Sequence, residues 1–203
     1  MTPVRAFPIR LPPVAGEALD SWLEALAHRM HACLGDLLAG VGVASGGQAG
    51  RAQAWTVLLG PGEAAGIAAA TGVPQPEVEA MTVARYDGTA VRIDRPNRRV
   101  SRYHLWGRGS GSRYCPDCLA ASGGRWLLAW RLGWCFACPE HRRLLADICP
   151  ACGRPQRRRP HPGYMIPQPG CCPNPLPGSS GLTAQRCLDP RRPRVVNARD
   201  VGP

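Results

Sequence analysis

The sequence contains no lysine, and all 25 of its basic residues are arginine. In a chain that also has 24 glycines and 22 prolines, this composition is typical of a genome rich in G and C. The number of arginines therefore does not by itself indicate a nucleic-acid partner.

A membrane-spanning segment and an export signal are also missing. No run of about 18 apolar residues exists, which argues against a transmembrane helix. Residues 1–13 lack the apolar stretch and the cleavage site of a signal peptide. We therefore expect a cytoplasmic protein, in which ten cysteines indicate metal binding rather than disulfides.

The sequence also lacks the usual signatures of a metal-dependent or thiol-dependent enzyme. No set of three ligands with a glutamate base is visible, and the His-x-Glu plus Pro-Cys-x-x-Cys pattern of nucleic-acid deaminases is absent. The strand-to-helix setting of a redox Cys-x-x-Cys is missing as well. We expect no enzymatic activity, with a zinc-dependent nucleic-acid enzyme as the least favoured alternative.

The charged residues that the sequence does contain are distributed unevenly along the chain. The first 91 residues hold 5 arginines against 8 acidic residues, whereas the rest hold 20 arginines against 6 acidic residues. This asymmetry favours a nucleic-acid partner for the second part, with a basic disordered tail as the alternative after residue 153.

The first part has the apolar periodicity of helices. A helix is expected over 17–40, with Gly35 as a possible break, followed by helical segments at 51–60, 63–71 and 75–82. The turn at Gly72 between the last two favours a helix-turn-helix-like segment over an ordinary helical hairpin. Glu77 and Glu79 on the second helix argue against base reading, so a protein-binding surface stays open.

The second part carries cysteine and histidine pairs at zinc-ligand spacing. Cys115 and Cys118 precede Cys138 and His141 by a 19-residue gap, and Cys149 and Cys152 form a further pair. The last pair needs two partners, for which Cys172 and Cys187 are the best candidates. We therefore predict two structural zinc sites with these eight ligands: Cys115, Cys118, Cys138, His141, Cys149, Cys152, Cys172 and Cys187.

Three other residues are alternative ligands. Cys135 is expected to be a buried side chain, but it is also placed to replace Cys138 or His141. Cys171 is an alternative to Cys172, and His161 is a weaker option for the second site.

Tryptophans and arginines surround the predicted zinc sites. Trp126, Trp130 and Trp134 are four residues apart and are expected to share one helical face in the core of the zinc module, with base stacking as the alternative. Residues 154–170 are too rich in proline and arginine to be expected in a core. Arginines on both sides of the zinc ligands are the predicted nucleic-acid contacts: Arg92, Arg95, Arg98, Arg99, Arg102, Arg108, Arg113, Arg154, Arg157, Arg158 and Arg159.

These observations predict a mainly α fold with small zinc-bound β elements. A helical domain is expected over 1–91, an Arg-rich zinc-binding module over 92–189 and a disordered basic tail over 190–203. A short strand is expected at 91–93, where the first two meet.

The same motifs, in this order, resemble the TniQ family of transposon-encoded proteins. The opening FPIRLPP at 7–13 and GEALDSWL at 16–23 is similar to that of the family. YCPDCL at 114–119, the tryptophan segment 126–134, CPEH at 138–141 and CPACG at 149–153 follow in the family's order. In that family the positions of Cys138 and His141 are ligands, whereas the position of Cys135 varies.

The resemblance implies a DNA transposition adaptor that takes part in choosing the insertion site. The partners that it implies are DNA, an ATPase regulator, a transposase, an RNA-guided targeting complex and a second copy of the chain. Family members are often longer, so we expect a compact or truncated member. The alternative function is a zinc-finger transcription regulator.

Overall fold

The computed structural model describes residues 6–43, 54–101, 103, 108, 110–158, 161–179 and 184–187. Within this part the helices and strands are short and run in the order α1 (Leu19–Arg29), α2 (Leu34–Gly40), α3 (Ala54–Val57), α4 (Pro61–Thr71), α5 (Gln75–Ala80), η1 (Val83–Tyr86), β1 (Ile93–Asp94), β2 (Arg99–Val100), α6 (Pro116–Ala121), η2 (Leu128–Arg131), β3 (Ala137–Cys138) and β4 (Arg143–Leu144). The predicted class, mainly helical with small β elements, is confirmed for these residues.

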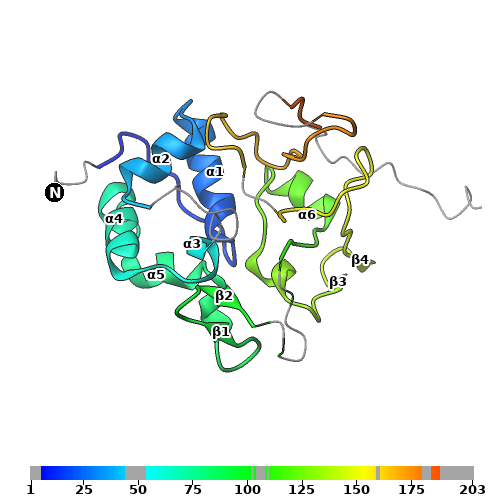
Figure 1. Ribbon diagram of the computed structural model, residues 1–203, viewed down its shortest axis with the longest axis horizontal. Helices are drawn as coiled ribbons and strands as arrows, with labels where there is room; N and C mark the ends of the chain where they lie inside the picture. The colour runs from blue at the N-terminus through cyan, green and yellow to red at the C-terminus, as the bar shows by residue number, and fades with distance from the viewer. Residues whose placement is uncertain are drawn as a thin grey trace, which may run out of the picture.

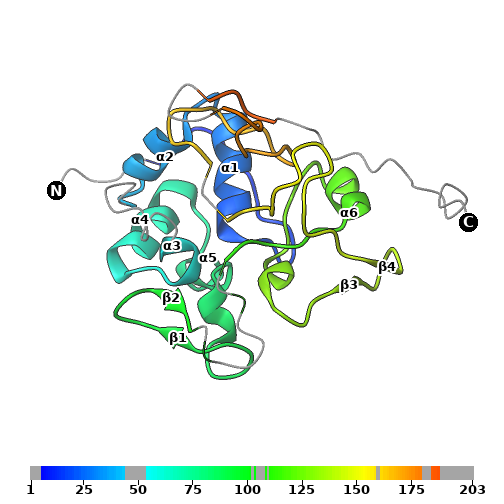
Figure 2. The ribbon, with the colours of Figure 1, turned by 45° about the vertical axis from the view of Figure 1, so that its right-hand side comes forward.

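Helices α2 to α5 lie on one side of α1, and α6 with the β3–β4 hairpin lies on the other side (Figures 1 and 2). The two sheets are antiparallel pairs, β1 with β2 and β3 with β4. In the first pair Ile93 is opposite Val100, and in the second Cys138 is opposite Arg143. The expected strand at 91–93 is thus observed two residues later, at Ile93–Asp94.

The helical side has its own apolar core. Trp22, Leu23, Leu26 and Ile67 are buried in it, together with further leucines and alanines of α1, α2 and α4. Burial of this face explains the periodic apolar pattern from which the helices were predicted.

The predicted helix 17–40 is two helices, and the break is not at Gly35. Helix α1 ends at Arg29, and His31, with a φ of 51°, turns the chain before α2 begins at Leu34. Gly35 lies inside α2, where its N–H donates to the carbonyl of Gly163 at 2.8 Å. A β-carbon at residue 35 would lie 2.8 Å from that oxygen, so this glycine serves a close backbone contact.

The helical hairpin was predicted correctly in outline. Helix α4 begins at Pro61 and ends at Thr71, and Gly72 then adopts a φ of 76°, the left-handed conformation of a helix C-cap. Helix α5 follows after three residues and is shorter than predicted. Residues 45–50, whose glycine-rich sequence predicts a loop, lie outside the described residues.

The predicted tryptophan helix is wrong. Residues 126–134 form an extended segment with one short 3-10 turn, η2, so the three indoles do not share a helical face. Trp126 and Trp130 are buried and meet edge to face, with ring centroids 5.9 Å apart, whereas Trp134 is 37% exposed. The spacing of four residues did not indicate a helix here, because a β-bridge between Glu17 and Leu127 and the packing of Trp126 against Tyr114 hold this segment extended.

The expectation that residues 154–170 stay out of the core is also wrong. Gln156, Arg157 and His161 are buried, and the backbone carbonyls of Gly163 and Met165 accept hydrogen bonds from the first turn of α2. A segment without regular secondary structure is held here by polar pairing rather than by apolar content. The predicted tail 190–203 lies outside the described residues.

Buried ion pairs join α1 to the second part of the chain. Arg125 donates to both carboxylate oxygens of Glu17 at 2.6 and 2.8 Å, and Arg131 donates to Asp20. A separate apolar cluster joins Val83 and Val91 to Leu128 and Leu132, across the predicted domain boundary at residue 91. The division into a helical domain over 1–91 and a zinc-binding module over 92–189 stays a prediction.

No helix in the described part of the chain has both the length and the apolar character needed to cross a bilayer.

Candidate metal centres and arginine surface

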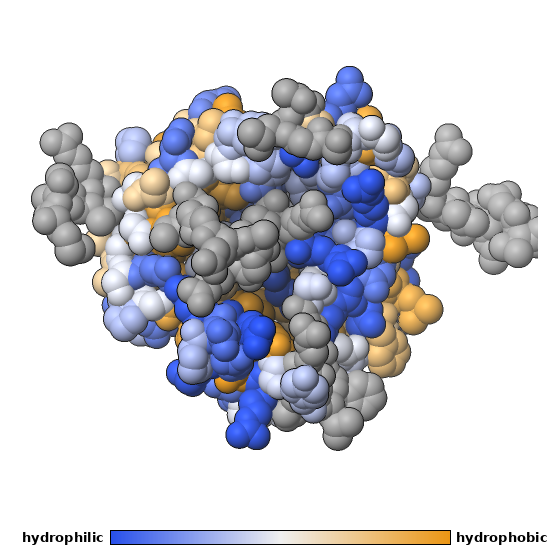
Figure 3. Space-filling model, in the orientation of Figure 1, coloured by the Kyte–Doolittle hydropathy of each residue, from blue (hydrophilic) through white to orange (hydrophobic). Residues whose placement is uncertain are grey.

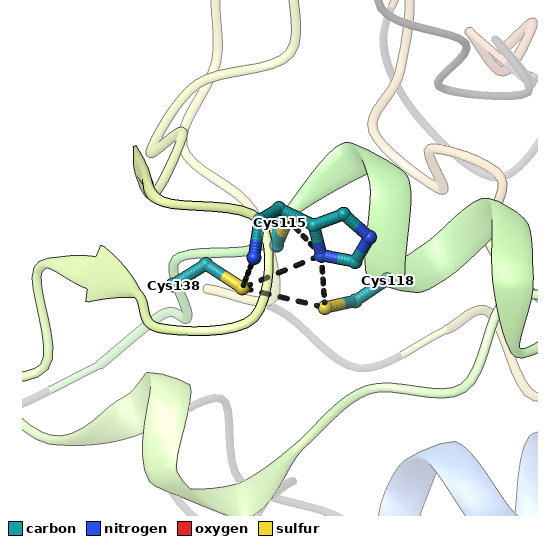
Figure 4. A group of neighbouring side chains, drawn as sticks. Cys115, Cys118 and Cys138 are labelled. Atoms are coloured by element: carbon teal, nitrogen blue, oxygen red, sulfur yellow. Dashed lines mark hydrogen bonds between the residues drawn. The ribbon is translucent and has the colours of Figure 1, made fainter.

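The first centre is formed by residues from a helix start and a hairpin. Cys115 is the N-cap of α6 and Cys118 lies in its first turn, whereas Cys138 ends β3 and His141 lies in the turn before β4. Pro116 at the first position of α6 fixes the backbone of that turn. The side chains of Cys115, Cys118 and Cys138 converge on one point (Figure 4).

The distances between these ligand atoms fit a tetrahedral zinc ion. The sulfurs of Cys118 and Cys138 are 3.6 Å apart, and Nδ1 of His141 lies 3.2 to 3.6 Å from all three sulfurs. A zinc ion about 2.3 Å from each sulfur places neighbouring sulfurs about 3.8 Å apart. Four protein ligands close such a site, which is typical of structural rather than catalytic zinc.

The three thiols differ in acidity. Burial raises the pKa of Cys115 and of Cys118 above the ordinary value. Burial acts in the same direction on Cys138, but hydrogen bonds from the backbone and side chain of His141 outweigh it and lower the pKa of Cys138 to about 7. Since metal binds the thiolate, zinc would displace protons from Cys115 and Cys118, and its affinity would fall in acid.

The second centre contains the four cysteines that the spacing predicted. Cys149, Cys152, Cys172 and Cys187 bring their sulfurs within 4.8 Å of one another. Cys149 and Cys187 are 3.7 Å apart, as are Cys152 and Cys172, which again matches the edge of a zinc tetrahedron.

Side-chain amides surround the second centre. Nε2 of Gln156 donates to the sulfur of Cys172 at 3.5 Å, and Nδ2 of Asn174 approaches that of Cys152 at 3.9 Å. Such donors offset the negative charge of thiolates around a metal and orient them. Gln156 is buried, and its Nε2 also donates to the main-chain carbonyl of Arg154 at 3.0 Å.

The alternative ligands lie outside both groups. In the described residues, the two clusters able to hold a metal ion include neither Cys135 nor Cys171 nor His161. Cys135 is half-buried against the apolar clusters, and burial raises the pKa of its thiol. His161 is buried in a different place, beside Arg157 and Trp126 in a small cavity.

Of the nine predicted nucleic-acid contacts that the structure describes, five arginines have carboxylate partners. Arg95 pairs with Asp87, Arg98 with Glu63, Arg99 with Asp94 and Arg108 with Asp147. Arg92, Arg154 and Arg158 are exposed. Arg102 and Arg159 lie outside the described residues.

Two of the predicted contacts are engaged inside the protein. Arg113 donates to the carbonyls of Gly133 and Cys135 at 2.9 and 3.0 Å. Arg157 is buried and donates to Glu24 at 2.6 Å and to Asp20 at 2.5 Å. The expectation that Arg157 contacts phosphate is therefore corrected, because its guanidinium is enclosed between α1 and Trp126.

Comparison with known families adds one decisive observation. The sequence model of the TniQ family matches residues 8–145 of this chain. The chain belongs to the TniQ family. The match covers all of the helical side and all four ligands of the first centre, and it ends before Cys149. No curated protein matches the chain significantly.

Sequence reasoning missed several residues that organise this TniQ fold. Asp20 and Glu24 fall within the helix predicted over 17–40 and were given no role, yet both are buried and ion-paired. Arg125 and Arg131 were given no role either, yet Arg125 pairs with Glu17, just before α1, and Arg131 pairs with Asp20 in its first turn. An acidic residue on an otherwise buried helical face was the one available signal for such partners.

Proposed function

We propose that this TniQ-family chain is a non-enzymatic adaptor in DNA transposition, which binds DNA and partner proteins during target-site selection. The observation that carries the proposal is the family match over residues 8–145. The partners that we propose are an ATPase regulator and a transposase of the same element. A second copy of the chain and an RNA-guided targeting complex are further proposed partners.

The metal centres support an adaptor rather than an enzyme. In both four-ligand groups, a tetrahedral ion would have all its positions filled by protein atoms. We propose that zinc occupies both and acts as a cross-link that holds residues 110–187 in shape. Structural zinc of this kind contributes folding free energy and leaves no coordinated water for hydrolysis.

An exposed apolar surface supports the protein-binding part of the proposal. Phe136, the residue before β3, and Leu144, in β4, are 61% and 72% exposed. Figure 3 shows hydrophobic surface at the edge of the molecule that carries this hairpin. Large apolar side chains that gather on a surface are typical of protein contacts.

The proposal is tested in two assays. In cells, deletion of the gene should abolish targeted insertion by its element, and the wild-type gene should restore it while Cys138→Ser should not. In vitro, the purified zinc-loaded chain should bind duplex DNA without cutting it and without hydrolysing ATP. Unchanged insertion after deletion, or nicking that a single substitution removes from a folded protein, would contradict the adaptor.

The transcription regulator remains the second candidate, because α4, Gly72 and α5 have the order of a helix-turn-helix. The helix-turn-helix interpretation stays a prediction, and the exposed Glu77 and Glu79 on α5 weigh against DNA reading by this element. A regulator should bind one duplex and not an unrelated one, whereas phosphate-based binding should be similar on both.

A further inference from the structure

Five arginine side chains from four separate places in the sequence line one cavity of about 180 Å³. The cavity lies between β2, with α3 behind it, and the segments of the metal-binding part around residues 110, 131 and 158. Its charged lining residues are Arg98, Arg99, Arg108, Arg131 and Arg158. Among the described residues that line it, none is acidic.

Carboxylates fix several of these guanidiniums without entering the cavity. Arg98 is held by Glu63 and by the carbonyl of Leu58 at 2.7 Å. Arg108 is held by Asp147. Because a guanidinium has five N–H donors, an arginine that uses two or three of them on a carboxylate or carbonyl keeps others for a ligand.

Arg131 forms the least exposed part of the cationic wall. Its side chain is 9% exposed and donates to Asp20, which also accepts from Arg157. Burial lowers the pKa of Arg131. One terminal nitrogen of Arg131 is bonded to Asp20, and a guanidinium has further N–H donors that an anion in the cavity can accept from.

A glycine brings Arg108 and Arg158 together on one wall. Gly111 adopts a φ of 81°, and a β-carbon there would lie 3.3 Å from Cγ of Arg158 and 3.5 Å from a terminal nitrogen of Arg108. The N–H of Ser112 donates to the carbonyl of Gln156 at 3.0 Å, which holds the two segments in register. Arg158 is exposed, and no carboxylate of the described chain pairs with it.

The size and lining of the cavity select the ligand. Small-molecule sites occupy about 300–1,000 Å³, so this cavity suits one anionic group rather than a whole cofactor. Val83, Val91 and Val100 supply an apolar lining that strengthens charge interactions. Several guanidiniums around a compact anion are the arrangement that recognises phosphate oxygens.

We propose that this cavity takes one phosphate group of a nucleic-acid backbone. The assignment to nucleic acid, rather than to free phosphate, rests on the proposed role of the chain in transposition. The cavity fixes where the duplex backbone meets the protein, at the junction of the helical side and the metal-binding part. Base edges do not enter the interaction, so the contact is independent of DNA sequence.

Four variants test the proposal. Arg158→Ala removes a lining cation that has no structural carboxylate partner in the described chain. Ser110→Glu places an acidic group at an exposed lining position, where it competes with phosphate. Ser110→Gln is the neutral control of similar size, and Arg29→Ala removes an exposed charge that does not line the cavity.

The measurement is fluorescence anisotropy of a labelled duplex, titrated with each folded variant over a range of salt concentrations. Loss of one phosphate contact lowers the slope of log affinity against log salt by about 0.9. Arg158→Ala and Ser110→Glu should show this decrease on two unrelated duplexes, and both controls should keep the wild-type slope. Equal slopes for all variants would overturn the proposal that the cavity binds a backbone phosphate. Duplex binding, and with it the proposed adaptor function, would still stand.

Nuclear magnetic resonance distinguishes the source of the phosphate. The amide signal of Gly111 in wild-type protein should shift with duplex DNA at concentrations where inorganic phosphate alone has a smaller effect. A shift with inorganic phosphate and none with DNA would overturn the assignment to nucleic acid. If the wild type binds no duplex at all, both this proposal and the DNA-binding part of the proposed function fail.

Discussion

The guanidinium of Arg157 lies over the indole of Trp126, with its central carbon 4.6 Å from the ring centroid. The same guanidinium pairs with Asp20 and Glu24 of α1, so one side chain connects the helical side to the core of the first metal centre. Trp126 also contacts Tyr114, the residue before the first ligand, at a centroid distance of 5.3 Å. A cation–π contact joined to two carboxylates explains why a basic segment enters the interior.

Arg157→Ala should destabilise the protein strongly, because it leaves the buried Glu24 without its cation. Removal of one partner of a buried ion pair costs about 3–5 kcal/mol. The neighbouring exposed Arg158 is the matched control, and Arg158→Ala should change the free energy of unfolding by less than about 0.5 kcal/mol. Urea unfolding of both variants measures the difference. Equal stabilities would show that Arg157 is not part of the fold.

Metal analysis should find two zinc ions per chain in protein purified under reducing conditions. Cys138→Ser should lose the first ion and unfold residues around it, since structural zinc supplies on the order of 10 kcal/mol of apparent binding free energy. Cys135→Ser should keep both ions and near-normal stability, because Cys135 lies outside the ligand cluster. Equal damage from the two substitutions would mean that the ligand assignment is wrong.

At the second centre the informative pair is Cys172 and its neighbour Cys171. Cys172→Ser should reduce the zinc content by one ion per chain, whereas Cys171→Ser should leave it at two. Inductively coupled plasma mass spectrometry of the two variants measures this directly. Zinc loss from Cys171→Ser alone would mean that Cys171, and not Cys172, is the ligand of the second zinc ion.

Two glycines of α4 should respond in opposite directions to alanine. A β-carbon at Gly66 would lie 2.2 Å from the carbonyl oxygen of Val41, so Gly66→Ala should force the helix away from its neighbour at a cost of about 1–3 kcal/mol. Gly62 has no atom of the described chain within 4 Å of that position. Gly62→Ala should therefore stabilise the helix by about 0.4–1 kcal/mol. Thermal unfolding separates the two, and destabilisation by both would indicate a contact of Gly62 outside the described residues.

His161 should make stability depend on pH. Burial, and then repulsion from Arg157 and Arg186, lower the pKa of His161 from 6.5 to about 4. The folded protein therefore disfavours the protonated ring. Because the unfolded chain protonates His161 more readily, protonation favours unfolding. The free energy of unfolding is unaffected by His161 above pH 6.5 and falls by about 3 kcal/mol in total as the pH drops from 6.5 towards 4.

The comparison with His161→Leu isolates this effect from the protonation of other groups, including metal ligands. The free energy of unfolding of the wild type should fall more steeply between pH 7 and pH 4 than that of the variant. Chemical denaturation at several pH values gives both curves. Parallel curves would show that the ring is protonated as readily in the folded protein as in the unfolded one.

The sequence by itself determined the features that depend on local spacing. Apolar residues every three or four positions located α1 and α2, and Gly72 located the turn after α4, because a left-handed residue there favours glycine. Pairs of ligands three residues apart identified both metal clusters, since a tight turn brings two such side chains to one point. The family resemblance was readable for the same reason, and the match over 8–145 confirms it.

Only the tertiary structure decided what the arginines do. Arg157 and Arg158 are neighbours in the same basic run, yet the first is buried against Trp126 and the second is exposed beside a cavity. Their different positions depend on Asp20 and Glu24, which are more than 130 residues away in the chain. Composition gives the number of charges, but whether a charge faces solvent or a buried carboxylate depends on which distant segments fold against it.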